Sequence, residues 1–199
     1  MPIMPTSSHL PGAAFSRRRA VWASAALAVL GWGMPSLGRA AHVVKPWPAA
    51  KPVPALDLAG LDGKRWRLDA TTGRVVVINF WATWCEPCRN EMPSLQALAQ
   101  RRRRDGVTVV TVNYRESVEV VQQFLARVPV KMPILLDADG EATTAWTPRV
   151  FPSTVLVGRD GQPALTVLGD LDWEGEEARA LLDPLVAQQR RRSGEQAYP

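Results

Sequence analysis

The sequence of 199 residues predicts one α/β domain with a mixed central sheet, helices on both faces and an N-terminal β-hairpin extension. Two features of the chain predict this class. Apolar, β-branched runs of strand length alternate with helical stretches, as in parallel strands connected by helices. The last two such runs flank the turn residues 159–162, Arg-Asp-Gly-Gln, so we expect them to form an antiparallel hairpin at one edge of the sheet.

Residues 1–40 are expected to be a signal peptide or an N-terminal membrane anchor rather than part of the fold. Three arginines, Arg17 to Arg19, precede the uncharged stretch 20–34. That stretch is shorter than a membrane span of roughly 20 residues and suits the apolar core of a secretory signal. Cleavage after Ala40 is the preferred boundary, while an uncleaved anchor and twin-arginine export through SRRRAV remain open. We therefore expect a periplasmic or otherwise extracytoplasmic protein.

The positive charge of the chain is concentrated in this first segment. Residues 1–40 contain four arginines and no acidic residue, whereas the whole chain has a formal net charge of +5. The rest is nearly neutral, which argues against nucleic acid as a partner, because that would require basic residues gathered on one face. Two arginine clusters, 101–104 and 190–192, are expected to end helices, where cations complement the dipole. Contact with a membrane surface or a partner is the alternative.

Three further segments follow the expected signal. Residues 41–54 contain four prolines, which disfavour a helix and stiffen an extended spacer, so we expect a Pro-rich linker. Residues 55–189 are long enough for one domain with a proper core. Residues 190–199 are expected to be a disordered tail. We expect the protein to be a monomer.

The secondary structure of residues 55–189 is expected in the following order. Residues 54–68 alternate in polarity and break at Asp62-Gly63, which predicts a hairpin. Five further runs have strand character, at 75–80, 107–112, 133–136, 154–157 and 163–168. Four stretches have helical character, at 86 to about 104 with a kink at Pro93, 117 to about 128, 140–146 and 173–189.

The only two cysteines, Cys85 and Cys88, directly follow the expected buried strand 75–80 and open the next helix. A redox-active dithiol explains this placement. The first sulfur lies near unsatisfied backbone N–H groups, which favour its thiolate. Cys85 is then the attacking nucleophile, and the less exposed Cys88 attacks the resulting mixed disulfide and releases the product. No cofactor or metal beyond this pair is expected.

Three other interpretations of the cysteine pair fit the sequence poorly. A zinc site needs about four nitrogen or sulfur ligands, but the only histidines, His9 and His42, lie in the expected signal and linker. A structural disulfide between residues three apart closes a very small loop and removes little chain entropy. A one-cysteine peroxidase of the peroxiredoxin pattern would carry proline and threonine where Ile78 and Ala82 stand.

Residues 79–93, NFWATWCEPCRNEMP, resemble the active site of the TlpA-like and ResA-like thiol-disulfide oxidoreductases, which are exported thioredoxin-like proteins with a redoxin domain. Trp84, Pro87 and Pro93 match the family motif, and the resemblance extends from about residue 54 to 185. It implies a thioredoxin-like fold and a disulfide reductase that acts on exported proteins, with apocytochrome c among the candidates. It also implies a membrane electron donor of the DsbD or CcdA type.

The segment Val150-Phe151-Pro152 resembles the cis-proline segment of the same family. The resemblance implies that Pro152 lies opposite the dithiol and that the backbone of Val150 and Phe151 pairs with an extended substrate segment as an added strand. Trp84 and Pro87 are assigned to the same substrate-binding surface. Trp81 belongs either to that apolar surface or to the core.

Acidic residues near the pair bear on proton transfer and on the direction of electron flow. Glu91 matches an acidic residue of ResA-like members, which implies a base for Cys88; a solvated carboxylate early in the helix is the alternative. Asn79 stands where cytosolic thioredoxins carry an acid, and an amide cannot relay a proton. Glu86 opposes thiolate formation beside the pair, which tunes the dithiol toward electron donation.

Two other functions remain open from the sequence. A thioredoxin-fold chaperone that binds exported clients would use the groove beside Pro152 and would not need the thiols. A thiol oxidant would use the same cysteines with electron flow reversed, and its reduction potential would distinguish it from a reductase.

Overall fold

The computed structural model describes residues 42–195. The expected signal peptide or anchor at 1–40 lies outside this range, as do the last four residues of the expected tail. Within residues 42–195, no helix combines the length and apolar character needed to cross a membrane.

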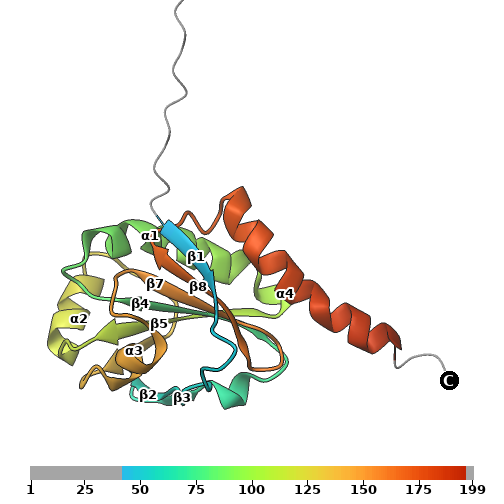
Figure 1. Ribbon diagram of the computed structural model, residues 1–199. Coiled ribbons are helices and arrows are strands. Elements are labelled where there is room, and N and C mark those ends of the chain that lie inside the picture. Colours follow the sequence, from blue (N-terminus) through green and yellow to red (C-terminus); the bar gives the residue numbers. More distant parts are fainter. Residues whose placement is uncertain (1–41, 196–199) are drawn as a thin grey trace, which may run out of the picture. The chain divides into compact units, whose positions relative to one another are not determined.

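An eight-stranded mixed sheet forms the centre of the domain, with strand order β1-β8-β7-β4-β5-β6-β2-β3 (Figure 1). Its strands are β1 (His42–Pro46), β2 (Asp57–Gly60), β3 (Arg65–Arg67), β4 (Val75–Trp81), β5 (Val107–Tyr114), β6 (Ile134–Asp137), β7 (Ser153–Val157) and β8 (Pro163–Gly169). β4, β5 and β6 are parallel neighbours, while all other neighbouring pairs are antiparallel. The predicted mixed sheet is confirmed.

β4 is buried along its whole length because helices cover both faces of the sheet at its centre. Its side chains alternate between two apolar clusters, with Val75, Val77 and Trp81 in the first and Val76, Ile78 and Phe80 in the second. This arrangement explains why the sequence of β4 is apolar at every position except Asn79, instead of alternating.

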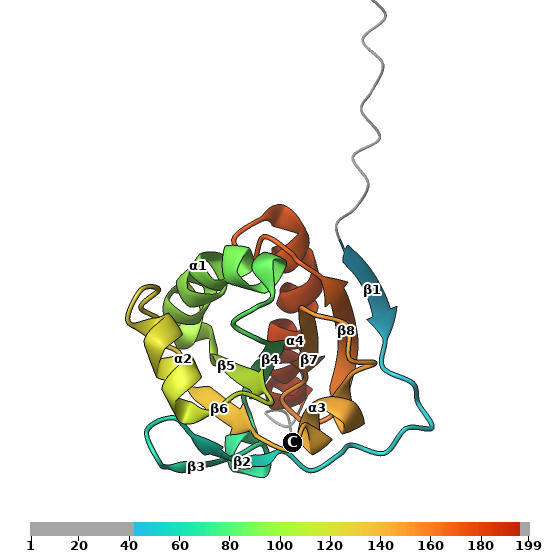
Figure 2. The same cartoon turned by 90° about the vertical axis from the view of Figure 1, so that its left-hand side faces the viewer.

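Within residues 42–195, four α-helices pack on the sheet: α1 (Glu86–Arg101), α2 (Val118–Leu125), α3 (Glu141–Trp146) and α4 (Glu176–Glu195). Two short 3-10 turns, Asp69–Thr71 and Arg103–Asp105, follow β3 and α1. Buried residues of α1, α2 and α4 join the first apolar cluster, while Trp146 of α3 joins the second. Helices therefore lie on both faces, as predicted, and Figure 2 shows α1 and α3 on opposite sides of the sheet.

The expected linker is wrong over residues 42–46, because these residues form β1 and pair antiparallel with β8 from His42↔Gly169 to Pro46↔Leu165. β1 is an edge strand that ends at Pro46, so the missing proline N–H does not interrupt a central ladder. The prolines that suggested a spacer mostly follow this strand. His42 also contacts Glu177 of α4 at 2.8 Å.

The expected disordered tail is wrong over residues 190–195, because α4 continues to Glu195. The helix also begins at Glu176, three residues later than expected. After Pro184 the sequence contains no further proline before the helix ends, and its first glycine is Gly194. Local sequence therefore gives no strong stop signal at residue 189.

Candidate active site

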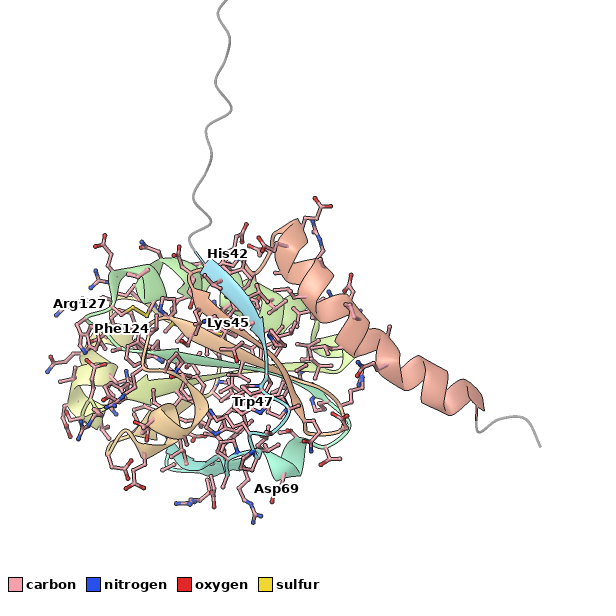
Figure 3. All side chains as sticks on the ribbon, viewed as in Figure 1. His42, Lys45, Trp47, Asp69, Phe124 and Arg127 are labelled. Carbon is pink, nitrogen blue, oxygen red and sulfur yellow. A yellow bond between two sulfur atoms is a disulfide. The ribbon has the colours of Figure 1, made fainter. Side chains whose placement is uncertain are left out.

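Cys85 and Cys88 form a disulfide with an S–S distance of 2.01 Å, drawn as the yellow bond in Figure 3. Cys85 is the N-cap of α1, and its sulfur accepts a hydrogen bond from the Cys88 backbone N–H at 3.3 Å. This contact is the type that favours a thiolate at a helix N-terminus. Cys85 is 5% exposed and Cys88 is 0% exposed, so both are buried and only Cys85 retains an accessible edge.

An aromatic surface lies beside the disulfide. Trp84 is 63% exposed, and its ring packs edge-on against Phe151 with 5.7 Å between the ring centroids. Phe151 also contacts Tyr114, with 5.2 Å between their centroids. Trp81, in contrast, is fully buried and packs on Phe124 of α2, so it belongs to the core.

The Phe151-Pro152 peptide bond is cis, as the resemblance implied. The Pro152 carbonyl accepts a hydrogen bond from the Gly169 N–H at 2.9 Å, which holds the segment against the end of β8. Phe151 packs against the apolar cluster that contains both cysteines. Val150 is 46% exposed, so this segment offers an apolar side chain to solvent beside Phe151, which packs against the Trp84 ring.

Glu91 is 4% exposed, and its carboxylate accepts three hydrogen bonds inside the protein. One oxygen accepts from Asn79 Nδ2 at 2.7 Å, and the other accepts from the Trp173 indole at 3.2 Å and the Leu171 N–H at 3.3 Å. Burial raises the pKa of Glu91 to about 7, because desolvation of the charged form outweighs these hydrogen bonds. The alternative of a solvated carboxylate is wrong for Glu91.

Asn79 connects Glu91 to the strand that follows Pro152. Its amide nitrogen also donates to Thr154 Oγ1 of β7 at 3.0 Å, and its Oδ1 is buried without a hydrogen-bond partner in the described structure. The sequence indicated only that Asn79 replaces an acid. Its direct contact with Glu91, together with that of Trp173, was not predicted.

The remaining motif residues lie in the first turn of α1. Glu86 is exposed there, as expected of an acidic residue near the positive end of the helix dipole. Pro87 is half-buried near the helix start, where its missing N–H costs no helical hydrogen bond. Arg89 donates from Nη1 to the Thr83 carbonyl at 3.3 Å, which connects the helix to the preceding loop.

Residues 48–181, more than half of the chain, match the family model described as Redoxin. The chain belongs to the redoxin family. The fold agrees with this assignment, because residues 48–181 contain the sheet from β2 to β8, the cis-proline segment and the disulfide.

Two curated relatives of this redoxin are named thiol-disulfide oxidoreductase ResA. The protein from Bacillus subtilis is 34% identical over 118 residues, which make up 59% of this chain and 66% of the relative. The protein from Geobacillus thermodenitrificans is 31% identical over 121 residues, which make up 61% of this chain and 70% of the relative. The matched segment thus spans about two thirds of the length of these relatives.

A solved structure gives the same picture of the fold. The exposed lipoprotein thioredoxin Etrx1 from Streptococcus pneumoniae is 25% identical, with a TM-score of 0.58, and the match covers 66% of this redoxin and 98% of that chain. The predicted thioredoxin-like fold is confirmed. With its family, its relatives and its Cys85–Cys88 disulfide, this redoxin is a thiol-disulfide oxidoreductase.

Proposed function

We propose that this redoxin reduces disulfides of exported proteins. In the reduced enzyme the Cys85 thiolate attacks one substrate sulfur, and the other substrate sulfur leaves with the electron pair and takes a proton. Cys88 then loses its proton and attacks Cys85, which releases the second substrate thiol. The enzyme ends with the Cys85–Cys88 disulfide, and the substrate ends with two thiols.

The observation that carries this proposal is the buried Glu91 carboxyl near the resolving cysteine. Residues three apart on a helix lie on the same face, about 5–6 Å apart between Cβ atoms, so Glu91 is a neighbour of Cys88. With a pKa of about 7, Glu91 accepts and gives up a proton near neutral pH. We assign it as the base that takes the Cys88 proton when the mixed disulfide forms.

Two acidic residues near the dithiol favour reduction over oxidation as its task. A carboxylate close to a sulfur destabilises the thiolate and therefore the reduced form, which lowers the reduction potential. Glu86 lies in the first turn of α1, and Glu91 adds a second negative charge above its pKa of about 7. The helix N-terminus acts in the opposite direction.

We expect a reduction potential closer to the value of about −270 mV for thioredoxin than to about −120 mV for the oxidant DsbA. Equilibration with a dithiol buffer, followed by counting free thiols, measures it. Glu86→Gln should raise the potential by up to about 30 mV, the equivalent of one pKa unit. A wild-type potential near that of DsbA would instead support the reversed, oxidising direction.

The substrate segment is proposed to bind along Val150 and Phe151, with Pro152 facing the dithiol. Within residues 42–195 the Phe151 main chain forms no backbone hydrogen bond, so its polar groups are open to an added strand. Trp84 forms one side of this surface through its contact with Phe151, and Pro87 lies in the adjacent first turn of α1.

Trp84→Ala should raise KM for a disulfide-bearing protein such as insulin about tenfold and leave kcat nearly unchanged. An exposed aromatic anchor at a binding surface typically contributes at least this much, and tenfold corresponds to about 1.4 kcal/mol. Val43→Ala, which removes an exposed apolar side chain from the distant β1 strand, is the matched control. Equal KM values for both variants would exclude Trp84 from substrate binding.

We further propose that the enzyme works outside the cytoplasm and receives electrons from a membrane donor of the DsbD or CcdA type. The charge pattern of residues 1–40 and the exposed lipoprotein among the similar structures support this location. Apocytochrome c is a candidate substrate. Proteins captured by Cys85 when the resolving cysteine is absent would identify the substrate.

A further inference from the structure

Glu116, between β5 and α2, holds the loop that carries the attacking cysteine. Its Oε2 accepts hydrogen bonds from the Thr83 backbone N–H at 2.7 Å and from Asn113 Nδ2 at 2.7 Å. Its Oε1 accepts from the Thr83 hydroxyl at 2.5 Å. The carboxylate thus connects the end of β5 to the loop between β4 and α1, although Thr83 and Glu116 lie 33 residues apart in the sequence.

The backbone before Glu116 has an unusual conformation. Arg115 has a φ of 56°, in the left-handed region that non-glycine residues rarely occupy. Its N–H donates to the Asp137 carbonyl at 3.0 Å, which anchors the turn to β6. Such conformations cost free energy, so they persist only where the surrounding structure maintains them, and they concentrate at functional sites. Here the turn leads directly to the residue that binds the Thr83 loop.

Thr83 is held from both sides. Glu116 binds its N–H and hydroxyl, while Arg89 of α1 donates to its carbonyl at 3.3 Å. Cys85 follows only two residues later, and its own N–H bonds to the Ala82 carbonyl at 3.2 Å. The position of the Cys85 sulfur relative to the N–H groups of α1 therefore depends on where Thr83 is fixed.

We propose that Glu116 is a positioning residue for Cys85: its carboxylate fixes Thr83 so that the Cys85 sulfur stays at the N-terminus of α1. The inference rests on the proposed attack by Cys85. It does not concern Glu91, which lies on the side of Cys88 and contacts neither Thr83 nor Asn113.

The test compares Glu116→Ala with Glu116→Gln in the full, reduced chain. Glutamine can keep all three contacts, because its oxygen accepts from the Thr83 N–H and Asn113 while its amide donates to the Thr83 hydroxyl oxygen. Alanine removes them all. Alkylation of Cys85 by iodoacetamide across a pH series gives the pKa of the thiol and the rate constant with which its thiolate is alkylated.

Glu116→Ala should raise the Cys85 thiol pKa by about one unit and slow alkylation at neutral pH about tenfold, because the sulfur moves away from the helix N–H groups. Glu116→Gln should stay within about twofold of the wild type or react faster, since it restores the contacts without the negative charge. Glu119→Ala is the matched control, because it changes an exposed glutamate of α2, and its Cys85 should be alkylated at the wild-type rate.

If Glu116 has only a structural role, Glu116→Ala should have a lower free energy of unfolding but keep the wild-type Cys85 pKa and alkylation rate. That result would overturn this inference and leave the proposed attack by Cys85 intact. If Glu116→Ala does not fold, Thr83→Val removes only the hydroxyl contact and should slow alkylation about threefold, while Thr83→Ser should not; equal rates for these two variants would overturn it as well. Preferential alkylation of wild-type Cys88 would overturn the proposed attack by Cys85 and, with it, this inference.

Discussion

Replacing Cys85 by serine is expected to abolish disulfide reduction completely. The thiolate is the nucleophile in thiol–disulfide exchange, and a serine hydroxyl does not ionise near neutral pH or form a disulfide. Cys88 cannot take over the attack, because its side chain is fully buried one helical turn inside α1. Insulin reduction and alkylation of the remaining thiol measure the loss.

Replacing Cys88 by serine should instead trap the substrate. Cys85 still attacks, but no second sulfur resolves the mixed disulfide, so covalent adducts accumulate at Cys85. Mass spectrometry of adducts that survive without reductant and disappear with it identifies the attached cysteine. Adducts formed mainly through Cys88 in the Cys85→Ser variant would reverse the assigned order of attack.

The double variant Cys85→Ser/Cys88→Ser separates catalysis from client binding. A reductase should lose all turnover in this variant. A chaperone that uses only the groove beside Pro152 should keep its effect on client aggregation undiminished. The chaperone function would be favoured if the double variant fully prevents aggregation of an exported client and cells that carry it still reduce their exported disulfides normally.

The central part of the fold could be predicted from the sequence because local signals and tertiary structure agree there. The near-continuous apolar run 75–80 lies in the fully buried β4, and the turn at 159–162 joins β7 to β8 as an antiparallel pair. β1 was missed because its pairing with β8 joins residues more than 100 positions apart, and its neighbouring prolines gave a stronger local signal.

The reactive pair could be predicted because its chemistry is local, with both cysteines at one helix end. The burial of Glu91 was also readable in principle, since it precedes Leu95 by four residues and lies on the same helix face as Cys88. Trp173 and Glu116 gave no comparable signal. Their contacts with Glu91 and Thr83 span 82 and 33 residues and depend on how the chain returns to the site.

Glu91→Gln is expected to change how stability depends on pH. Burial raises the pKa of Glu91 from 4.5 to about 7, so the folded protein binds a proton that the unfolded chain has already lost between these values. The contribution of Glu91 to the free energy of unfolding is therefore greatest below pH 4.5, and it is lost as the pH rises through about 7. A shift of this size corresponds to about 3 kcal/mol.

The glutamine variant should lack this dependence and still fold. Its oxygen can accept from Trp173 and Leu171, and its amide can donate to Asn79 if that amide rotates, since Asn79 Oδ1 has no other partner in the described structure. Urea unfolding of the oxidised protein between pH 4 and 8 should show the wild type losing about 3 kcal/mol relative to Glu91→Gln. Glu86→Gln, exposed on the same helix, is the control.

Glu91→Gln should lower kcat, although it raises the free energy of unfolding relative to the wild type near and above pH 7. If Glu91 takes the Cys88 proton, wild-type kcat rises with pH through an apparent pKa near 7, because only the ionised carboxylate can act as a base. Glu91→Gln should lose this step and about 100-fold in kcat, within the range for general base catalysis. A variant that gains stability at pH 8 but keeps the wild-type kcat profile would show that Glu91 is buried for another reason. The ionised carboxylate thus destabilises the fold at the pH at which the reaction requires it, a conflict expected of a residue maintained for catalysis.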